Sequence, residues 1–216
     1  MSSSPISPRL VNGGLVLMDP TTSQILRIVV LQYNPDTVTR SLQIKSVGES
    51  ADRSEALRLK GPAVETIKLD AEIDATDQLE VSDSTTLQFG ISPQLAALET
   101  IVYPTSSQLQ TNNNLEQIGT LEIIPMETPL VLFVWSKNRV VAVRITDVSI
   151  TEEAFDPNLN PIRAKVSLGM RVLTMDDLGF DHKGAAIFMA YLQQKEQLAG
   201  KSPAGTLGAL GIEQIT

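Results

Sequence analysis

Two stretches of the chain alternate apolar and polar residues, which is the pattern of half-buried β-strands. The polar series of residues 162–172 holds three basic side chains: Arg163, Lys165 and Arg171. The polar series of residues 63–75 holds four charged side chains: Lys68, Asp70, Glu72 and Asp74. Because the side chains of a strand point alternately to its two faces, each stretch is predicted to bury one face and expose the other.

The basic stretch ends a longer region, Pro129–Met175, whose pattern predicts three consecutive strands. Leu130–Trp135 is apolar at every position, Val140–Thr151 follows a short polar turn, and Ile162–Leu173 completes the group. The apolar series of the middle strand changes phase halfway along. A single extra residue restores the phase, so we predict a β-bulge at Thr146–Asp147.

Other parts of the chain predict further strands and two helices. Strands are expected over residues 10–18, 25–33, 38–47 and 118–125, and loops over residues 48–61, 77–87 and 105–114. A helix is expected over Pro93–Tyr103, because Ser92 is a suitable N-cap and Pro93 suits the first helical position. This helix is expected to cover Leu130–Trp135, whose two faces are both apolar. A second helix is expected over Gly184–Leu198 from its three- and four-residue apolar spacing.

This order of elements predicts a mainly-β domain, a barrel or a sandwich, with helices at its margin. We divide the chain into a flexible N-terminal arm over residues 1–9 and a β domain over residues 10–178. A C-terminal helix is expected over residues 179–199. Residues 200–216 are expected to form a tail that is flexible or ordered only on contact.

Composition narrows the classes of partner. The 216 residues carry a net charge of −8, which argues against general nucleic-acid binding, because neutralising phosphates requires a basic surface. The chain has no cysteine, so disulfides and thiolate metal sites are excluded. No signal-peptide pattern opens the sequence, and no run approaches the roughly 20 apolar residues of a membrane span. We therefore expect synthesis in the cytoplasm and no direct membrane insertion.

The acidic strand face is the best candidate for a metal site. Neighbouring carboxylates on one strand face lie about 7 Å apart, which is too far for Asp70, Glu72 and Asp74 to share one ion unaided. We expect a solvated or intersubunit face instead. The basic strand residues Arg163 and Lys165 are predicted to pair with this acidic strand, within one chain or between copies.

No catalytic constellation is present in the sequence. His182 is the only histidine and is expected at the surface, since no nucleophile-elbow motif accompanies it. Phosphate-binding glycine motifs are absent as well. The chain is therefore expected to be neither an enzyme nor a carrier of a cofactor or metal.

Several segments together resemble the tube-like proteins of contractile injection systems. In chain order they are QYNPDTVTRSL (32–42), GPAVETIKLDAEIDATD (61–77), SPQLAALETIVYP (92–104), the region 129–173 and the helix beyond it. Within the fourth segment, FDPNLNPIRAKV (155–166) is the most specific block. The resemblance covers roughly residues 26–192. The chain departs from the family pattern at Ser136, where glycine is common, and shows no LysM module pattern after Leu198.

This resemblance implies a phage tail-tube or Hcp-like β-barrel with an internal helix and a C-terminal helix. It implies a homohexameric ring in the baseplate that links the spike hub to the inner tube and initiates tube assembly. The implied partners are the spike or hub protein on one face, the tube protein on the other, and baseplate wedge proteins. After synthesis in the cytoplasm, the chain would become part of the injection particle. Seven residues are assigned to a subunit interface: Lys68, Asp70, Glu72, Asp74, Arg163, Lys165 and Arg171.

Two alternatives stay open. The chain could be the bulk inner-tube protein of the same particle, which polymerises along its length. In a different class, it could be a ligand- or metal-binding β-barrel, with Asp70 and Asp74 as the residues to test.

Overall fold

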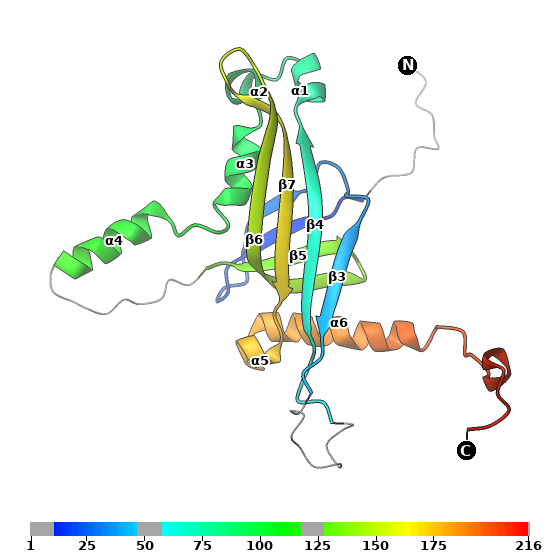
Figure 1. Ribbon diagram of the computed structural model, residues 1–216. Coiled ribbons are helices and arrows are strands. Elements are labelled where there is room, and N and C mark those ends of the chain that lie inside the picture. Colours follow the sequence, from blue (N-terminus) through cyan, green and yellow to red (C-terminus); the bar gives the residue numbers. More distant parts are fainter. Residues whose placement is uncertain (1–10, 47–57, 118–127, 216) are drawn as a thin grey trace.

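The computed structural model describes residues 11–46, 58–117 and 128–215. Seven antiparallel strands form one sheet in the order β2-β1-β5-β6-β7-β4-β3. The strands are β1 (Gly14–Met18), β2 (Ile25–Val30), β3 (Val38–Gln43), β4 (Val64–Asp74), β5 (Leu130–Ser136), β6 (Arg139–Phe155) and β7 (Pro161–Val172). The helices are α1 (Thr76–Glu80), α2 (Ser84–Phe89), α3 (Ser92–Glu99), α4 (Ser106–Gln117), α5 (Met175–Leu178), α6 (Lys183–Ala199) and the 3₁₀ helix η2 (Leu207–Leu210). Figure 1 shows the long strands β4, β6 and β7 side by side.

The mainly-β prediction is confirmed, and the three strands of 129–175 pair in sequence as expected. The bulge predicted at Thr146–Asp147 is confirmed too, because the register between β6 and β7 shifts between Ile145 and Asp147. Gly169 lies opposite the bulge, where an added Cβ would be 3.1 Å from the Asp147 Cβ. The shift lets Val143 and Val148 both face the core from opposite halves of one strand.

The closed barrel expected from the sequence is not formed by a single chain. β2 and β3 stand at the two ends of the strand order, and no ladder joins them within the residues that the structure describes. The sheet nevertheless bends so that the segment after β2 reaches the end of β4. There, the Gln32 amide nitrogen donates to the Asp74 carbonyl at 2.7 Å, and its oxygen accepts from the Asp74 N–H at 3.0 Å. One side chain therefore bridges a gap that strand pairing leaves open.

The main core lies on one face of this bent sheet. It joins apolar side chains of β1, β4, β5, β6 and β7 to α3 and α6. Ile67, Val141 and Val166 are among its fully buried members. Burial of such large aliphatic side chains is the chief stabilising contribution to a domain of this kind.

A second, smaller apolar cluster lies on the other face of β1, β5 and β6. It contains Met18, Leu130, Leu132 and Ala142, and side chains from α5 and α6 pack against it, Leu178 and Ile187 among them. The Leu130–Trp135 strand is thus covered on both faces, as its apolar run requires. The cover of the second face comes from α5 and α6, however, and not from the 93–103 helix, whose core residues belong to the main cluster.

Three helices occupy segments that were expected to be loops. α4 covers most of the polar stretch 105–114, although none of its residues is buried. α1 and α2 lie in the acidic segment 77–87, where the Asp83 side chain accepts a hydrogen bond from the Thr86 N–H and caps α2. These helices bury few or no residues, so their sequences show no apolar residues at helical spacing from which they could have been predicted. The strand expected over residues 118–125 lies outside the described residues.

The C-terminal helix predicted over 184–198 is confirmed as α6. His182 is its N-cap, and its Nδ1 accepts a hydrogen bond from the Gly184 N–H at 3.0 Å. The short helix α5 begins with a capping box in which Thr174 and Asp177 satisfy each other's backbone N–H groups. Among the described helices, none combines the length and the apolar character needed to cross a bilayer.

Candidate assembly surfaces

The acidic and basic strands singled out in the sequence are neighbours in one chain. β4 pairs with β7 antiparallel, which places Glu72 opposite Lys165 and Asp74 opposite Arg163. Pairing within a chain was one of the two predicted outcomes. Cross-strand pairs of opposite charge stabilise a sheet modestly, whereas like charges in the same register would repel.

Ion pairs tie these charges together across the sheet. The Arg163 guanidinium lies 2.7 Å from the Asp74 carboxylate and 3.9 Å from that of Glu72. Lys165 reaches sideways to Glu153 on β6 at 2.7 Å instead of to its direct neighbour on β4. The face is therefore a mixed lattice of charges and not an acidic patch.

The pKa of Asp74 is lowered from its ordinary value. The hydrogen bond from the Thr76 side chain lowers it most, burial is the next largest effect and raises it, and the Thr76 N–H and Arg163 lower it further. The Thr76 hydroxyl and the Arg163 guanidinium together occupy the oxygens of this carboxylate. In the part of the chain that the structure describes, no group of three metal-ligating side chains comes together. The cationic partner of Asp74 and Glu72 is therefore the Arg163 side chain of the same chain.

Arg171 takes part in a different contact. Its guanidinium lies 2.7 Å from the Asp177 carboxylate at the start of α5. Lys68 and Asp70 point outward on β4 and are exposed, and they make no ion pair within the described residues. The structure thus gathers the seven predicted interface residues on one side of β4 and β7, but only part of the set is paired within the chain.

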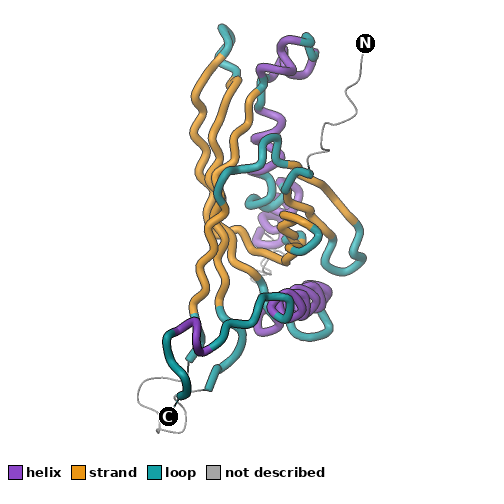
Figure 2. Tube along the Cα trace, turned by 90° about the vertical axis from the view of Figure 1, so that its right-hand side faces the viewer, coloured by secondary structure: helices purple, strands orange, loops and turns teal. Residues whose placement is uncertain are grey.

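This polar face is bare in the part of the chain that the structure describes, where Asp70, Glu72 and Lys165 are exposed. Figure 2 shows the long strands from the side, with α1, α2, α3 and α6 all on one side of them. On the open side, alternate residues of β4 and β7 carry polar side chains from Thr66 to Asp74 and from Arg163 to Arg171. A flat polar surface of this kind stays hydrated and offers no apolar patch to another protein.

One edge of β4 has no strand partner along part of its length within the described residues. β3 pairs with residues Val64–Leu69 of β4, so among the described strands the later residues Asp70–Ile73 have a neighbour on one side only. Gln32 satisfies the next residue, Asp74. An unpaired strand edge is a template for another strand, either from the same chain or from a second copy.

A buried carboxylate, which sequence reasoning missed, ties α6 to the sheet. Glu65 is only 3% exposed and accepts hydrogen bonds from Arg40 at 2.7 Å, Lys195 at 2.9 Å and the Tyr191 hydroxyl at 3.2 Å. Lys195 also lies over the Tyr191 ring, 4.1 Å from its centroid. The available signal was that Glu65 falls in the apolar series of the alternating strand, in phase with Ile67.

Burial raises the pKa of Glu65, but the hydrogen bonds from Arg40 and Lys195 outweigh it, so the net shift is downward. The pKa of Arg40 is raised, chiefly by its hydrogen bond to Glu65. Both shifts favour the charged pair. Because this network joins β3, β4 and α6, it acts as a clamp on the helix and not as a catalytic site.

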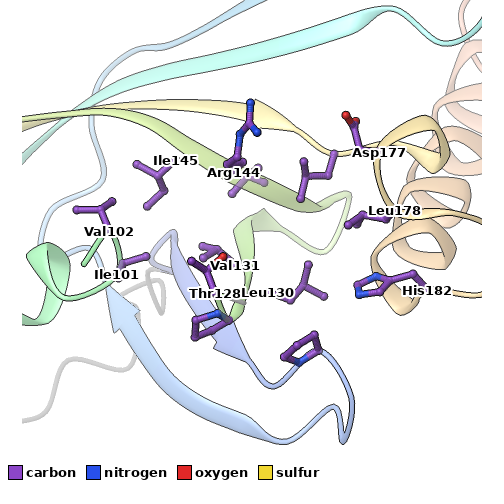
Figure 3. A pocket seen from close by; sticks show the side chains of 14 residues that line it. Ile101, Val102, Thr128, Leu130, Val131, Arg144, Ile145, Asp177, Leu178 and His182 are labelled. Atoms are coloured by element: carbon purple, nitrogen blue, oxygen red, sulfur yellow. The ribbon is translucent and has the colours of Figure 1, made fainter. Parts of the chain in front are cut away.

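A cleft of about 510 Å³ opens where β5, β6 and the α5–α6 region meet. Figure 3 shows Ile101 and Val102 at one end and Leu178 and His182 at the other. His182 already caps α6 and Asp177 already holds Thr174 and Arg171. The cleft therefore assembles no free acid–base pair.

No protein-family model matches the sequence, and no curated protein matches it either. Among solved structures, the chain is similar to one from the tail of an empty gene transfer agent particle computed with helical refinement and C6 symmetry. The identity is 11%, the TM-score is 0.28, and the match covers 74% of this chain and 90% of that chain. A chain from the virion of a native gene transfer agent particle gives 12% identity and a TM-score of 0.26 over the same shares. TM-scores this low carry no conclusion about this chain.

Proposed function

We propose that the chain is a structural protein of a contractile injection system or a related phage-type tail. Six copies form a ring in the baseplate, which links the spike hub to the inner tube and initiates tube assembly. The resemblance of residues 26–192 to the tube-like proteins of such particles motivates the assignment. The activity is assembly, and no catalytic step is invoked.

The observation that carries the proposal is the open sheet with one polar, exposed face. Beside the long strands, α1, α2, α3 and α6 lie on one side, the charged side chains of β4 and β7 lie on the other, and both end strands are free within the described residues. A ring of such sheets places the bare polar faces around a central channel and the helices outside. A hydrated lining of balanced charge lets a cargo or a spike slide past without adhering to it.

The free edge of β4 supports a place for the contact between copies. In the part of the chain that the structure describes, residues Asp70–Ile73 lack a strand on one side, and the exposed charges of Lys68, Asp70 and Glu72 lie beside that edge. Contacts in which different surfaces of identical subunits meet close into rings when the rotation is right. We propose that the seven charged residues lie at or next to this contact and that they set its register through charge complementarity.

Native mass spectrometry and negative-stain microscopy of the full-length protein, alone and with the tube and spike proteins of the same genome, test the proposal. The expected result is a six-fold ring that caps one end of the tube. A single ring per particle supports the initiator, whereas many rings identify the bulk tube protein. A chain that stays monomeric at high concentration and associates with neither protein would overturn the assignment.

A further inference from the structure

One sheet surface is apolar and has no cover from the residues that the structure describes. On β2, the side chains of Ile25, Ile28 and Val30 face away from the main core and are 59%, 56% and 59% exposed. A strand with exposed apolar side chains and a free edge is an aggregation hazard unless something covers it. We call these three side chains the outward face of β2.

This face continues a layer that is buried elsewhere in the molecule. Directly opposed residues share a face, so Ile28, Val16, Leu132 and Ala142 form one row across β2, β1, β5 and β6. Leu132 and Ala142 are buried beside α5 and α6, Val16 is half-buried, and Ile28 is exposed. The helices α5 and α6 therefore cover this row at β5 and β6 but not at β2. The outward face of β2 is as apolar as the buried part of the row.

A second apolar segment also has no cover from any described residue. Residues 196–215 are all exposed, and the backbone hydrogen bonds of residues 200–212 join residues of that stretch and the end of α6. The segment is not featureless, since the Thr206 side chain caps η2 by accepting from the Ala209 N–H. Its exposed apolar side chains are Leu207, Leu210, Ile212 and Ile215. We call residues 203–215 the tail segment.

The tail segment points away from the outward face of its own chain. α6 carries it beyond the β3 side of the sheet, and in both views it lies on the opposite side of the molecule from the β1–β2 hairpin. A contact between the two surfaces therefore joins different copies. Such a contact is heterologous, which is the kind that generates a ring.

The spacing of the two surfaces agrees. In a 3₁₀ helix, residues three apart stand one above the other, so Leu207 and Leu210 share a face about 6 Å apart. Ile28 and Val30, two apart on a strand, lie about 7 Å apart. We propose that the tail segment of one copy docks on the outward face of β2 in a second copy, with η2 across Ile28 and Val30. The proposal rests on the proposed assembly of the chain with copies of itself.

Cysteine pairs test this contact directly, because the native sequence contains no cysteine. Full-length protein carrying Ile28→Cys is mixed with tagged full-length protein carrying Leu210→Cys, and a short bismaleimide joins thiols that lie close together. Val81→Cys replaces Ile28→Cys in the control, because Val81 is 77% exposed and lies outside both surfaces. We expect several-fold more tagged heterodimer from the Ile28 pair than from the Val81 pair. Equal yields would overturn the proposal.

Two further readings separate this proposal from the assembly itself. Native mass spectra of the same mixtures report the oligomer: rings without the Ile28 cross-link overturn the tail contact and leave the ring standing. A chain that carries both Ile28→Cys and Leu210→Cys distinguishes the two geometries. A cross-link within one chain overturns docking on a second copy, whereas a cross-link between chains supports it. The triple variant Leu207→Ser, Leu210→Ser, Ile212→Ser is expected to lose the ring and to keep the monomer's unfolding midpoint.

Discussion

The two halves of the sheet are built by the same antiparallel pairing but are finished differently. In the half made of β1, β5 and the start of β6, both faces are apolar and both are covered, one by the main core and the other by α5 and α6. In the half made of β7, β4 and β3, one face is apolar, while the other is polar and bare. The bulge at Thr146 lies where β6 passes from one half to the other.

The comparison shows which surfaces need a partner. The bare face of β4 and β7 is stable in water, because its side chains are polar and several of its charges pair across the strands. The outward face of β2 belongs to the doubly apolar half but extends beyond its cover. The outward face of β2 is apolar like the covered half and exposed like the bare half. We therefore expect an assembly surface there.

The largest expected effect concerns the clamp that holds α6 over the covered half. Glu65→Ala removes the shared acceptor and leaves Arg40 and Lys195 facing each other without a counter-charge. We expect the free energy of unfolding to fall by about 3 kcal/mol, because removing one partner of a buried ionic network leaves the other charges uncompensated. Urea unfolding followed by tryptophan fluorescence measures it, since the only tryptophan, Trp135, stacks on the core residue Phe133.

Glu153→Ala is the matched control for this prediction. Glu153 also forms an ion pair, with Lys165 at 2.7 Å, but this pair lies on the bare face. The urea midpoint of this variant is expected to stay close to that of the wild type, because exposed pairs are solvated whether or not they form. Equal losses from Glu65→Ala and Glu153→Ala would contradict the distinction between the two halves.

The next effect compares two ends of one row. Leu132→Ala is expected to cost about 2–4 kcal/mol, because it opens a cavity beneath α5 and α6. Ile28→Ala, in the same row at the exposed edge, is expected to cost less than about 0.5 kcal/mol in the monomer. Urea titrations of both variants at low protein concentration check this. A similar cost for the two would mean that β2 is already covered in the isolated chain.

The sequence predicted those elements whose apolar residues recur with a regular spacing. The alternation of residues 63–75 and 162–172 predicted two strands correctly, and the phase change at Thr146 predicted the bulge. Both signals come from burial on one face of a strand. α4 has no buried residue and hence no apolar period, so its helix could not be found in the same way.

Of the two charged contacts, one could be predicted from the sequence and the other could not. Charge complementarity predicted that the acidic and basic strands pair, within one chain or between copies, and the register of β4 and β7 places Asp74 opposite Arg163 within one chain. The Glu65 clamp depends on α6 returning to the sheet, with Tyr191 and Lys195 lying 126 and 130 residues further along the chain. A contact of that range leaves no local pattern. The only sequence signal was a carboxylate in an apolar series, which a bulge or a strand end would explain equally well.

The clamp should also make the covered half sensitive to acid. The pKa of Glu65 in the folded chain lies below its ordinary value of 4.5, because the hydrogen bonds from Arg40 and Lys195 outweigh burial. The unfolded chain therefore takes up the proton first, so the contribution to stability is complete above pH 4.5 and is lost as the pH falls through the folded pKa. Thermal unfolding of the wild type and Glu65→Gln, measured from pH 7 to about pH 3, checks this. The difference in Tm between the two proteins is expected to shrink toward low pH, and a constant difference would contradict the assignment.

The smallest expected effect lies on the bare face. Arg163→Gln removes the guanidinium that holds Asp74 and approaches Glu72, but all three side chains are in contact with water. The Tm is expected to fall by no more than a few degrees at low salt, on the order of 1–3 °C. In about 1 M salt, where the screening length is about 3 Å, the difference should nearly vanish. The proposed ring should respond more strongly than the monomer, because in a symmetric assembly a charge change on this face is repeated in every copy. Native mass spectra at low and high salt separate the two effects: a ring unaffected by Arg163→Gln at either salt concentration would remove this residue from the subunit contact.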